Sequence, residues 1–337
     1  MSASSHTATP LQLGALTVDP PLILAPMAGV TDRDFRLIVR RIGGVGLVTM
    51  EFLASKGLVN GDRRVLRLAH FSEEERPISI QIYGSDPETM AEAARRVEAM
   101  GADACDINMG CPANKILKGC AGAALMGDLG LAARIVAQVR RALTIPLTVK
   151  FRLGLDDARR NFLDLGRICV EEGADAVAMH GRTAKQMYGG TADWAAIGEL
   201  KAALPIPVIG NGDVRTGDDA RRLRAETGCD AIMVGRGATR NPWVFREIAA
   251  ALTDGRISHP TLADRRQLIL DHFHTVCARD DAKHALHKLR TFTKWYSHGL
   301  PEGQALRRTL GAATVADDVL RAVAHHFDRL TAQKTAA

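Results

Sequence analysis

The sequence predicts an α/β fold, a (β/α)8 TIM barrel followed by a small all-α helical bundle domain. Two patterns support this prediction. Short apolar runs alternate with amphipathic stretches over about 220 residues, as in a parallel barrel. From residue 261 onward every stretch has the helical period instead.

Eight apolar runs are long enough for buried parallel strands. They lie at 22–30, 45–53, 78–84, 104–112, 147–154, 176–183, 207–214 and 231–238. Helical patterns separate most of them, at 87–101, 129–143, 162–173 and 218–228. Thr31 with Asp34 after the first run predicts a helix start there.

The chain divides into three parts on these patterns. Residues 1–20 form an N-terminal arm, 21–253 the barrel and 261–337 the helical domain. The segment 254–260 carries Gly and Pro and is the expected linker. Four helices are expected beyond it, at 262–281, 282–298, 301–311 and 315–330.

Composition narrows the class of protein. The first residues lack the basic and apolar regions of a signal peptide, and the apolar runs are too short to cross a bilayer. The six cysteines form no C-x-x-C pair, so a zinc or iron–sulfur site is not expected. Reduced, dispersed thiols and the missing signal predict a cytoplasmic protein that needs no metal ion and no membrane.

The net charge of +6 is concentrated at the C-terminal end. Residues 256–337 hold thirteen Lys or Arg against eight Asp or Glu, and eight of the eleven histidines. A basic tail domain predicts a polyanionic partner, although a solvated helical surface has the same composition.

Polar side chains share one face of several predicted strands. Because successive residues alternate between faces, each of these sets points the same way. The sets are Ser79, Gln81 and Tyr83; Asp106 and Asn108; Thr148, Lys150 and Arg152; His180; and Asn211. A core histidine or a Lys150–Asp106 ion pair would explain single members. The whole set predicts a ligand site at the carboxyl ends of the barrel strands.

The loops after the last two strands are rich in glycine. Barrels often bind phosphate between these loops, where Gly212, Gly235 and Arg236 would offer amide groups and a guanidinium. A phosphate site beside an inward lysine and two amides suggests flavin mononucleotide (FMN), with Gln81 and Asn108 facing a pyrimidine edge and Lys150 supplying positive charge.

The motifs of this sequence resemble those of the tRNA-dihydrouridine synthases, most of all those of the bacterial B-type subgroup. The resemblance runs from about Leu22 to the last helices. It rests on APMAGVTD (25–32), QIYG (81–84), DINMGCP (106–112), KFRLG (150–154), HGRT (180–183) with Tyr188, GGTADW (189–194), GNGD (210–213), and GR and NPW within 235–243.

This resemblance implies an FMN-binding barrel, NADPH or NADH as the reductant, and a helical tRNA-binding domain. It places the flavin contacts on Pro26, Met27, Ala28, Gln81, Lys150, His180, Asn211, Gly212, Asp213, Gly235 and Arg236, and the catalytic cysteine on Cys111. It places substrate contacts on Asn108, Arg152 and Arg182. The helical spacing of Lys283, His287, Arg290 and Lys294 predicts a further tRNA-binding face.

The implied reaction reduces the C5=C6 bond of D-loop uridines to 5,6-dihydrouridine. Hydride would reach C6 from the flavin, and Cys111 would protonate C5, because a thiol is a stronger acid than a hydroxyl. The target base would have to leave its stack. Two residues depart from the family pattern, Ala123 in place of a serine and Arg240 in place of a small residue.

Two other functions fit part of the sequence. An FMN-dependent reductase of a free pyrimidine would explain the barrel and the cysteine but not the basic tail. A non-catalytic RNA-binding or regulatory protein would not explain Cys111, Lys150 and the glycine loops together. The sequence does not define the oligomeric state; we expect a monomer.

Overall fold

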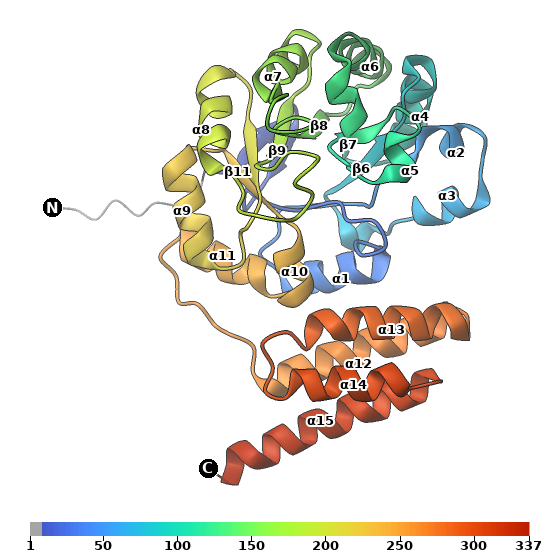
Figure 1. The fold of residues 1–337 in the computed structure, drawn as a ribbon, viewed down its shortest axis with the longest axis vertical. Helices are drawn as coiled ribbons and strands as arrows, with labels where there is room; N and C mark the ends of the chain where they lie inside the picture. The colour runs from blue at the N-terminus through green and yellow to red at the C-terminus, as the bar shows by residue number, and fades with distance from the viewer. Residues whose placement is uncertain (1–8, 337) are drawn as a thin grey trace, which may run out of the picture.

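The computed structural model describes residues 9–336, and its main part is the predicted barrel (Figure 1). Eight parallel strands pair in the order β4-β3-β11-β10-β9-β8-β7-β6, and the pairing of β6 with β4 closes the ring. The strands are β3 (Leu22–Leu24), β4 (Leu47–Thr49), β6 (Ile78–Tyr83), β7 (Ala104–Met109), β8 (Leu147–Arg152), β9 (Ala176–His180), β10 (Val208–Asn211) and β11 (Ala231–Val234). Each of the eight apolar runs contributes one strand, and a two-residue strand, β5 (Leu53–Ala54), adds to β6.

Helices surround the ring and cover the outward faces of the strands (Figure 1). They are α1 (Arg33–Ile42), α2 (Ser55–Val59), α3 (Arg63–Leu68), α4 (Pro87–Ala99), α5 (Asn114–Leu117), α6 (Leu129–Ala142), α7 (Phe162–Glu171), α8 (Trp194–Ala203), α9 (Gly217–Thr227), α10 (Arg236–Arg240) and α11 (Val244–Leu252). Two 3-10 turns, η1 (Glu73–Glu75) and η2 (Gly122–Gly127), complete the connections. Aspartate caps begin several of these helices; Asp86 accepts from the N–H of Thr89 at 2.8 Å and Asp128 from that of Leu131 at 2.9 Å.

The start of α1 differs from the prediction. Asp32, not Thr31, caps the helix, because its Oδ1 accepts from the N–H of Phe35 at 3.1 Å. The Thr31 hydroxyl instead exchanges hydrogen bonds with the backbone of Met27. Thr31 therefore closes the turn that follows β3, and a competing local bond moves the cap by one residue.

A hairpin within the N-terminal arm was not predicted. Strands β1 (Leu11–Leu13) and β2 (Leu16–Val18) pair antiparallel and bury Leu11, Leu13 and Val18. These side chains pack on the inward residues of the barrel, among them Ile23 and Ile209. The hairpin thus shields the interior of the barrel from water.

The helical domain lies against α1 and α10 of the barrel (Figure 1). Its helices are α12 (Leu262–Arg279), α13 (Ala282–Tyr296), α14 (Gly303–Ala312) and α15 (Ala316–Ala336). Lys288 of α13 joins the two parts, with its ammonium 2.8 Å from Asp32 and 2.9 Å from Asp280. Arg279 pairs with Asp34 of α1 beside it. These ion pairs hold the bundle close to the end of the barrel that carries the polar residues.

Candidate active site

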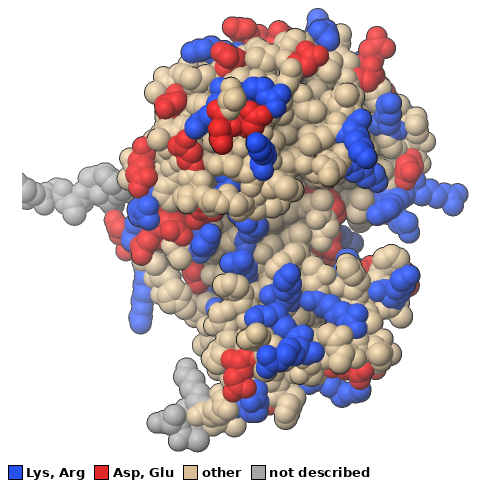
Figure 2. Space-filling view, viewed as in Figure 1, with Lys and Arg blue, Asp and Glu red and all other residues tan. Residues whose placement is uncertain are grey.

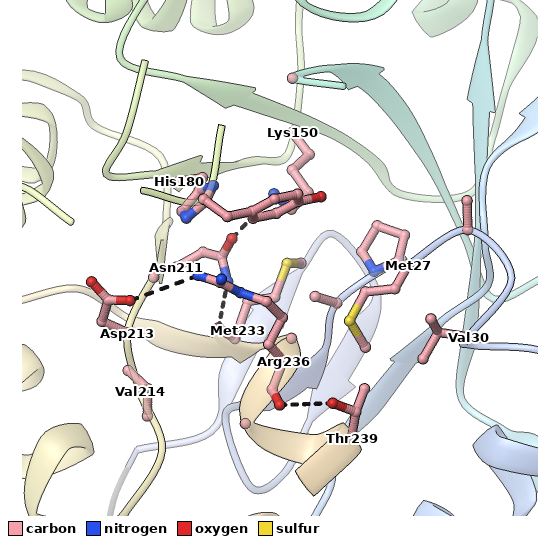
Figure 3. Close-up of a pocket in the computed structure, with 18 of the residues that line it drawn as sticks. Met27, Val30, Lys150, His180, Asn211, Asp213, Val214, Met233, Arg236 and Thr239 are labelled. Atoms are coloured by element: carbon pink, nitrogen blue, oxygen red, sulfur yellow. Dashed lines mark hydrogen bonds and ion pairs between the residues drawn. The ribbon is translucent and has the colours of Figure 1, made fainter. Parts of the chain in front are cut away.

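A pocket of about 750 Å³ opens at the carboxyl ends of the barrel strands (Figure 3). All eleven residues predicted to contact the cofactor line it: Pro26, Met27, Ala28, Gln81, Lys150, His180, Asn211, Gly212, Asp213, Gly235 and Arg236. Cys111, Asn108 and Arg152 line it as well. The structure therefore brings residues from many of the barrel strands and their loops into one cavity.

Strand register explains why these side chains meet. Asn108 of β7 lies beside Lys150 of β8, Arg152 beside His180 of β9, and His180 beside Asn211 of β10. Because neighbouring parallel strands place paired residues at one level, these five polar groups occupy two adjacent levels at the mouth of the barrel. Alternate residues such as Ile107 and Val149 point outward into the apolar layer under the helices.

Asp106 organises the amides at one side of the pocket. The Gln81 amide donates to Asp106 Oδ2 at 2.5 Å, and the Thr148 hydroxyl donates to the other carboxylate oxygen. Gln81 Oε1 then accepts from Asn108 Nδ2 at 2.8 Å. Burial raises the pKa of Asp106 to about 6, although the bonds from Thr148 and Gln81 lower it. Asp106 thus fixes the orientation of Gln81 and, through it, of Asn108.

Lys150 points into the pocket and bonds to Asn211 (Figure 3). Its ammonium donates to Asn211 Oδ1 at 3.2 Å, and Asn211 Nδ2 donates to the carbonyl of Met233 at 2.7 Å. Burial, followed by the positive charge of Arg152, lowers the pKa of Lys150 to about 8. The alternative of an ion pair between Lys150 and Asp106 within 4.0 Å is not formed among the described residues.

His180 and Arg182 contact each other, with Arg182 Nη1 3.3 Å from His180 Nε2, but only His180 lines the pocket. Burial and then the charges of Lys150 and Arg152 lower the pKa of His180 well below its ordinary value, so the imidazole is neutral at pH 7. Arg182 is 1% exposed and does not line the pocket. It donates to both oxygens of Asp213, at 2.9 and 2.7 Å, and to the carbonyls of Gly189 and Gly190. The structure gives Arg182 a part in positioning these loops rather than a place on the pocket surface.

The loop of Cys111 is fixed on both sides. Asn108 Oδ1 accepts from the N–H groups of Gly110, at 3.1 Å, and of Cys111, at 2.9 Å. Arg152 Nε donates to the Gly110 carbonyl at 2.8 Å, and the N–H of Ala123 donates to the Cys111 carbonyl at 3.0 Å. Cys111 is therefore held at the pocket rim by bonds from β7, β8 and η2, and the residue is only partly buried.

The two glycine loops leave amide groups free. The backbone N–H groups of Gly212, Asp213 and Gly235 donate to no acceptor within residues 9–336. Gly212 has φ +128°, and a Cβ there would come within 2.7 Å of Ala192 Cβ. Burial raises the pKa of Asp213, but the hydrogen bonds from Ala192 and Arg182 lower it, and the pKa stays below its ordinary value. The loops therefore present unsatisfied N–H donors close together. The Asp213 carboxylate is bound to Arg182. The guanidinium of Arg236 lies 3.9 Å from the same carboxylate (Figure 3).

Aromatic residues that the site prediction omitted also line the pocket. The guanidinium of Arg236 lies 4.7 Å, and that of Arg152 5.7 Å, from the ring centre of Tyr188. Phe52 meets Tyr83 edge to face at 5.2 Å. Tyr188 accompanies the HGRT motif of the family resemblance, so the sequence could have assigned it to the site. Phe52 has no distinguishing signal in the sequence.

The helical domain supplies one wall of the pocket, which the sequence did not predict. Arg265 of α12, Trp295 of α13 and His298 line it beside Arg240 and Asn241 of the barrel. Their place depends on how the two domains dock, and no local pattern encodes that. Figure 2 shows Lys and Arg around the hollow between the two parts.

The predicted tRNA-binding face of α13 lies outside the pocket. Lys283, His287, Arg290 and Lys294 are all exposed. Arg290 is also engaged, since it donates to the backbone carbonyl of Ala313. Within the described part of the chain no helix is long and apolar enough to cross a membrane, and no three His, Cys, Asp or Glu side chains form a metal-binding group.

Comparison with known proteins agrees with the resemblance. The dihydrouridine synthase (Dus) family model matches residues 23–332. The chain is 41% identical over 323 residues to "tRNA-dihydrouridine synthase B" of Xanthomonas campestris, covering 96% of this chain and 97% of that protein. It is also 41% identical over 321 residues to a "Probable tRNA-dihydrouridine synthase" of Mycobacterium tuberculosis, covering 92% and 82%.

Among solved structures, a 2-naphthoyl-CoA reductase complex has a similar fold. The TM-score is 0.59 over 82% of this chain and 59% of that one, at 13% sequence identity. At this identity the likeness concerns the barrel architecture only.

Proposed function

Because the chain belongs to the dihydrouridine synthase family, we propose that it is an oxidoreductase that reduces uridines of tRNA to 5,6-dihydrouridine. The substrate positions would be specific D-loop uridines. One observation carries the proposal beyond family membership: Cys111 lies on a loop fixed by four hydrogen bonds, at the rim of the pocket that holds every predicted flavin contact.

The pocket fits FMN. Its volume of about 750 Å³ suits a ligand of that size, since small-molecule sites span roughly 300–1,000 Å³. The free N–H groups of Gly212, Asp213 and Gly235, with Arg236, would bind the phosphate. Gln81, Lys150 and the backbone of 26–28 would contact the ring. When bound, FMN would supply hydride to C6 of the uracil, after reduction by NADPH or NADH.

Cys111 would complete the reduction by giving its thiol proton to C5. The bonds to Asn108 and Ala123 restrict the backbone of the loop, which holds Cys111 beside the pocket. The resulting thiolate would recover a proton from solvent, because Cys111 is only partly buried. Hydride at one carbon and a proton at the other account for both hydrogens of the product.

Asn108 and Arg152 would hold the uracil. Asn108 Nδ2 uses one hydrogen on Gln81 and keeps the second for a carbonyl in the pocket. Arg152 is 4% exposed and lines the same wall. Lys150, with a pKa of about 8, is mainly charged at pH 7 and would stabilise negative charge that develops on the ring system.

The exposed cations of α13 would bind the tRNA backbone. Lys283, His287 and Lys294 face solvent, and phosphate contacts by such groups release counterions. Cytoplasmic location, a monomeric state and a reaction that needs no metal ion complete the proposal and rest on the sequence.

The test compares two substrates for the purified flavin-loaded protein with NADPH. One is tRNA from a strain lacking dihydrouridine synthases, and the other is free uridine or uracil. Dihydrouridine in the tRNA alone supports the proposal. Reduction of the free pyrimidine with unmodified tRNA would instead establish the small-substrate reductase considered from the sequence.

A further inference from the structure

A hydrogen bond from Arg182 constrains the His180 imidazole at the wall of the pocket. Arg182 Nη1 lies 3.3 Å from His180 Nε2. A guanidinium group carries only donors, so Nη1 donates in this contact and Nε2 accepts with its lone pair. Burial and then the charges of nearby cations lower the pKa of His180 well below its ordinary value, so the imidazole carries one proton. That proton must lie on the other nitrogen, Nδ1.

Arg182 is not free to turn away from His180, because its other donors are engaged. Nε donates to the Gly189 carbonyl at 2.9 Å. Nη2 donates to the Gly190 carbonyl at 2.7 Å and to the two carboxylate oxygens of Asp213 at 2.9 and 2.7 Å. The side chain is also buried. These three partners fix the plane of the guanidinium, and the fixed plane aims Nη1 at the imidazole.

The Nδ1 side of the imidazole is open to the pocket, which His180 lines (Figure 3). A Cβ on Gly212 would come within 3.0 Å of His180 Cδ2 and 3.4 Å of Nε2, so that edge of the ring packs against the glycine loop. Nδ1 has no hydrogen-bond partner within residues 9–336 and is not enclosed by the core. An N–H group on this side therefore needs an acceptor from a ligand.

The neighbours of His180 favour a ligand atom that accepts hydrogen bonds. Lys150 points into the same part of the pocket, and its ammonium already donates to Asn211 at 3.2 Å (Figure 3). Arg152 lines the pocket as well and adds a second positive charge. A protonated Nδ1 adds a donor beside these cations. Together they suit a carbonyl oxygen or an unprotonated ring nitrogen, most of all one on which negative charge develops.

We propose that Arg182 is a positioning residue that holds His180 in the Nδ1–H tautomer, so that the imidazole donates a hydrogen bond to an acceptor atom of the flavin. The inference deepens the proposed function and rests on it for the identity of the ligand. The Asp213 carboxylate that holds Arg182 also accepts from the N–H of Ala192 at 2.7 Å. One ion pair therefore supports both the tautomer and the glycine loop, and the tautomer is set before any ligand binds.

Nuclear magnetic resonance locates the imidazole proton directly. In protein that contains isotope-labelled histidine, long-range proton–nitrogen spectra distinguish the two tautomers, and His180→Asn identifies the signals of His180. The wild type should show the Nδ1–H pattern with and without flavin, because the Arg182 contact lies within the protein. An Nε2–H pattern in the wild type would overturn the proposal, and this result requires no variant of Arg182 to fold.

Arg182→Met removes the donor and keeps a long side chain. The imidazole should then change to the Nε2–H tautomer that neutral histidine prefers in water, and flavin should bind about tenfold more weakly. Arg160→Met is the matched control, because Arg160 also pairs with an aspartate, Asp193 at 2.6 Å, but does not line the pocket. It should keep the Nδ1–H pattern. A purely structural role of Arg182 would weaken flavin binding without changing the tautomer, and that outcome would also overturn the proposal.

Two replacements of His180 test which nitrogen meets the flavin. The amide of asparagine lies near the position of Nδ1, whereas the amide of glutamine lies near that of Nε2. His180→Asn should therefore keep flavin affinity close to the wild type, and His180→Gln should lose about tenfold, as measured by flavin fluorescence. Equal affinities, or the opposite order, would contradict the assignment.

None of these measurements depends on dihydrouridine formation. A failure of the proposed tRNA reaction would leave both the tautomer and the flavin affinities measurable. It therefore remains distinguishable from a failure of the part assigned to Arg182.

Discussion

The side-chain oxygen of Asn108 accepts a hydrogen bond from the backbone N–H of Cys111 at 2.9 Å. The same oxygen accepts from Gly110, while the amide nitrogen donates to Gln81 at 2.8 Å. One side chain therefore links the cysteine loop to the pocket wall. This arrangement gives Asn108 a positioning part in addition to its proposed contact with uracil.

Asn108→Ala should disconnect this link. Two N–H groups lose their acceptor, the loop gains freedom, and kcat for tRNA reduction should fall by about 100-fold. Flavin reduction by NADPH without tRNA should change much less, because it does not use the cysteine. Single-turnover measurements of the two half-reactions check this; equal losses in both, or a normal kcat, would show that the loop does not depend on Asn108.

Two glycines near Cys111 offer a matched pair. Gly122 has φ +60°, and a Cβ there would come within 2.8 Å of the Cys111 carbonyl oxygen, whereas a Cβ on Gly119 would meet only the Ile116 carbonyl at 3.4 Å. Gly122→Ala should therefore displace Cys111, lower kcat at least tenfold and cost about 1 kcal/mol or more of stability. Gly119→Ala should behave like the wild type in turnover and in urea unfolding. Equal behaviour of the two variants would contradict the packing described.

The contribution of Asp106 to the free energy of unfolding should fall as pH rises through the acid range. Its pKa is raised to about 6, so the folded state favours the neutral acid. The resulting stabilisation is present below the unfolded pKa near 3.9, is lost as pH rises through about 6, and is at most about 3 kcal/mol. Asp106→Asn should remove this contribution to the pH dependence and still bond Gln81 and Thr148.

Urea unfolding at pH 4.5 and pH 7 measures the effect as a difference between proteins. The free energy of unfolding of Asp106→Asn minus that of the wild type should be larger at pH 7 than at pH 4.5. The control is Asp157→Asn, which changes an exposed aspartate outside the pocket. If the free energy of unfolding depends on pH in the same way for the wild type and for Asp106→Asn, the buried Asp106 carboxyl is not the source of that dependence.

The face of α13 should make tRNA binding depend on salt. Lys283 and Lys294 are exposed, so their double replacement by alanine should weaken tRNA binding. The slope of log K against log salt concentration should become shallower by about 1 for each phosphate that the variant no longer binds. Arg321→Ala removes an exposed arginine that pairs with Asp318 on α15 and serves as the control. A slope equal to that of the wild type would place the tRNA elsewhere.

Strand positions and site residues were predictable because local patterns encode them. Alternation placed Asp106, Asn108 and Lys150 on inward faces, and their register in the barrel then brought them together. The N-terminal hairpin was missed because its strands have only three residues each. The cap at Asp32 was misplaced because the Thr31 side chain bonds to Met27 instead.

The domain junction could not be read from the sequence. No sequence pattern distinguishes Lys288, yet it joins Asp280 to Asp32 of the barrel. Trp295 and His298 line the pocket because the helical domain docks beside it, through these ion pairs and through packing such as that of Phe292 on Phe35. Likewise, Arg182 matched a substrate-binding motif position, but its donors are engaged by Asp213, His180 and the 189–190 backbone. Docking and side-chain competition are tertiary effects that no local pattern contains.

The most direct test of the account is dihydrouridine formation by Cys111→Ala, mapped by position on unmodified tRNA with NADPH. Cys120→Ala is the control, since Cys120 is an exposed cysteine nearby that does not line the pocket. The wild type and Cys120→Ala should form dihydrouridine at discrete D-loop positions. Cys111→Ala should bind flavin and tRNA normally but lose most turnover. Near-normal turnover of Cys111→Ala, or no product from a wild type whose flavin is bound and reducible, would contradict the account.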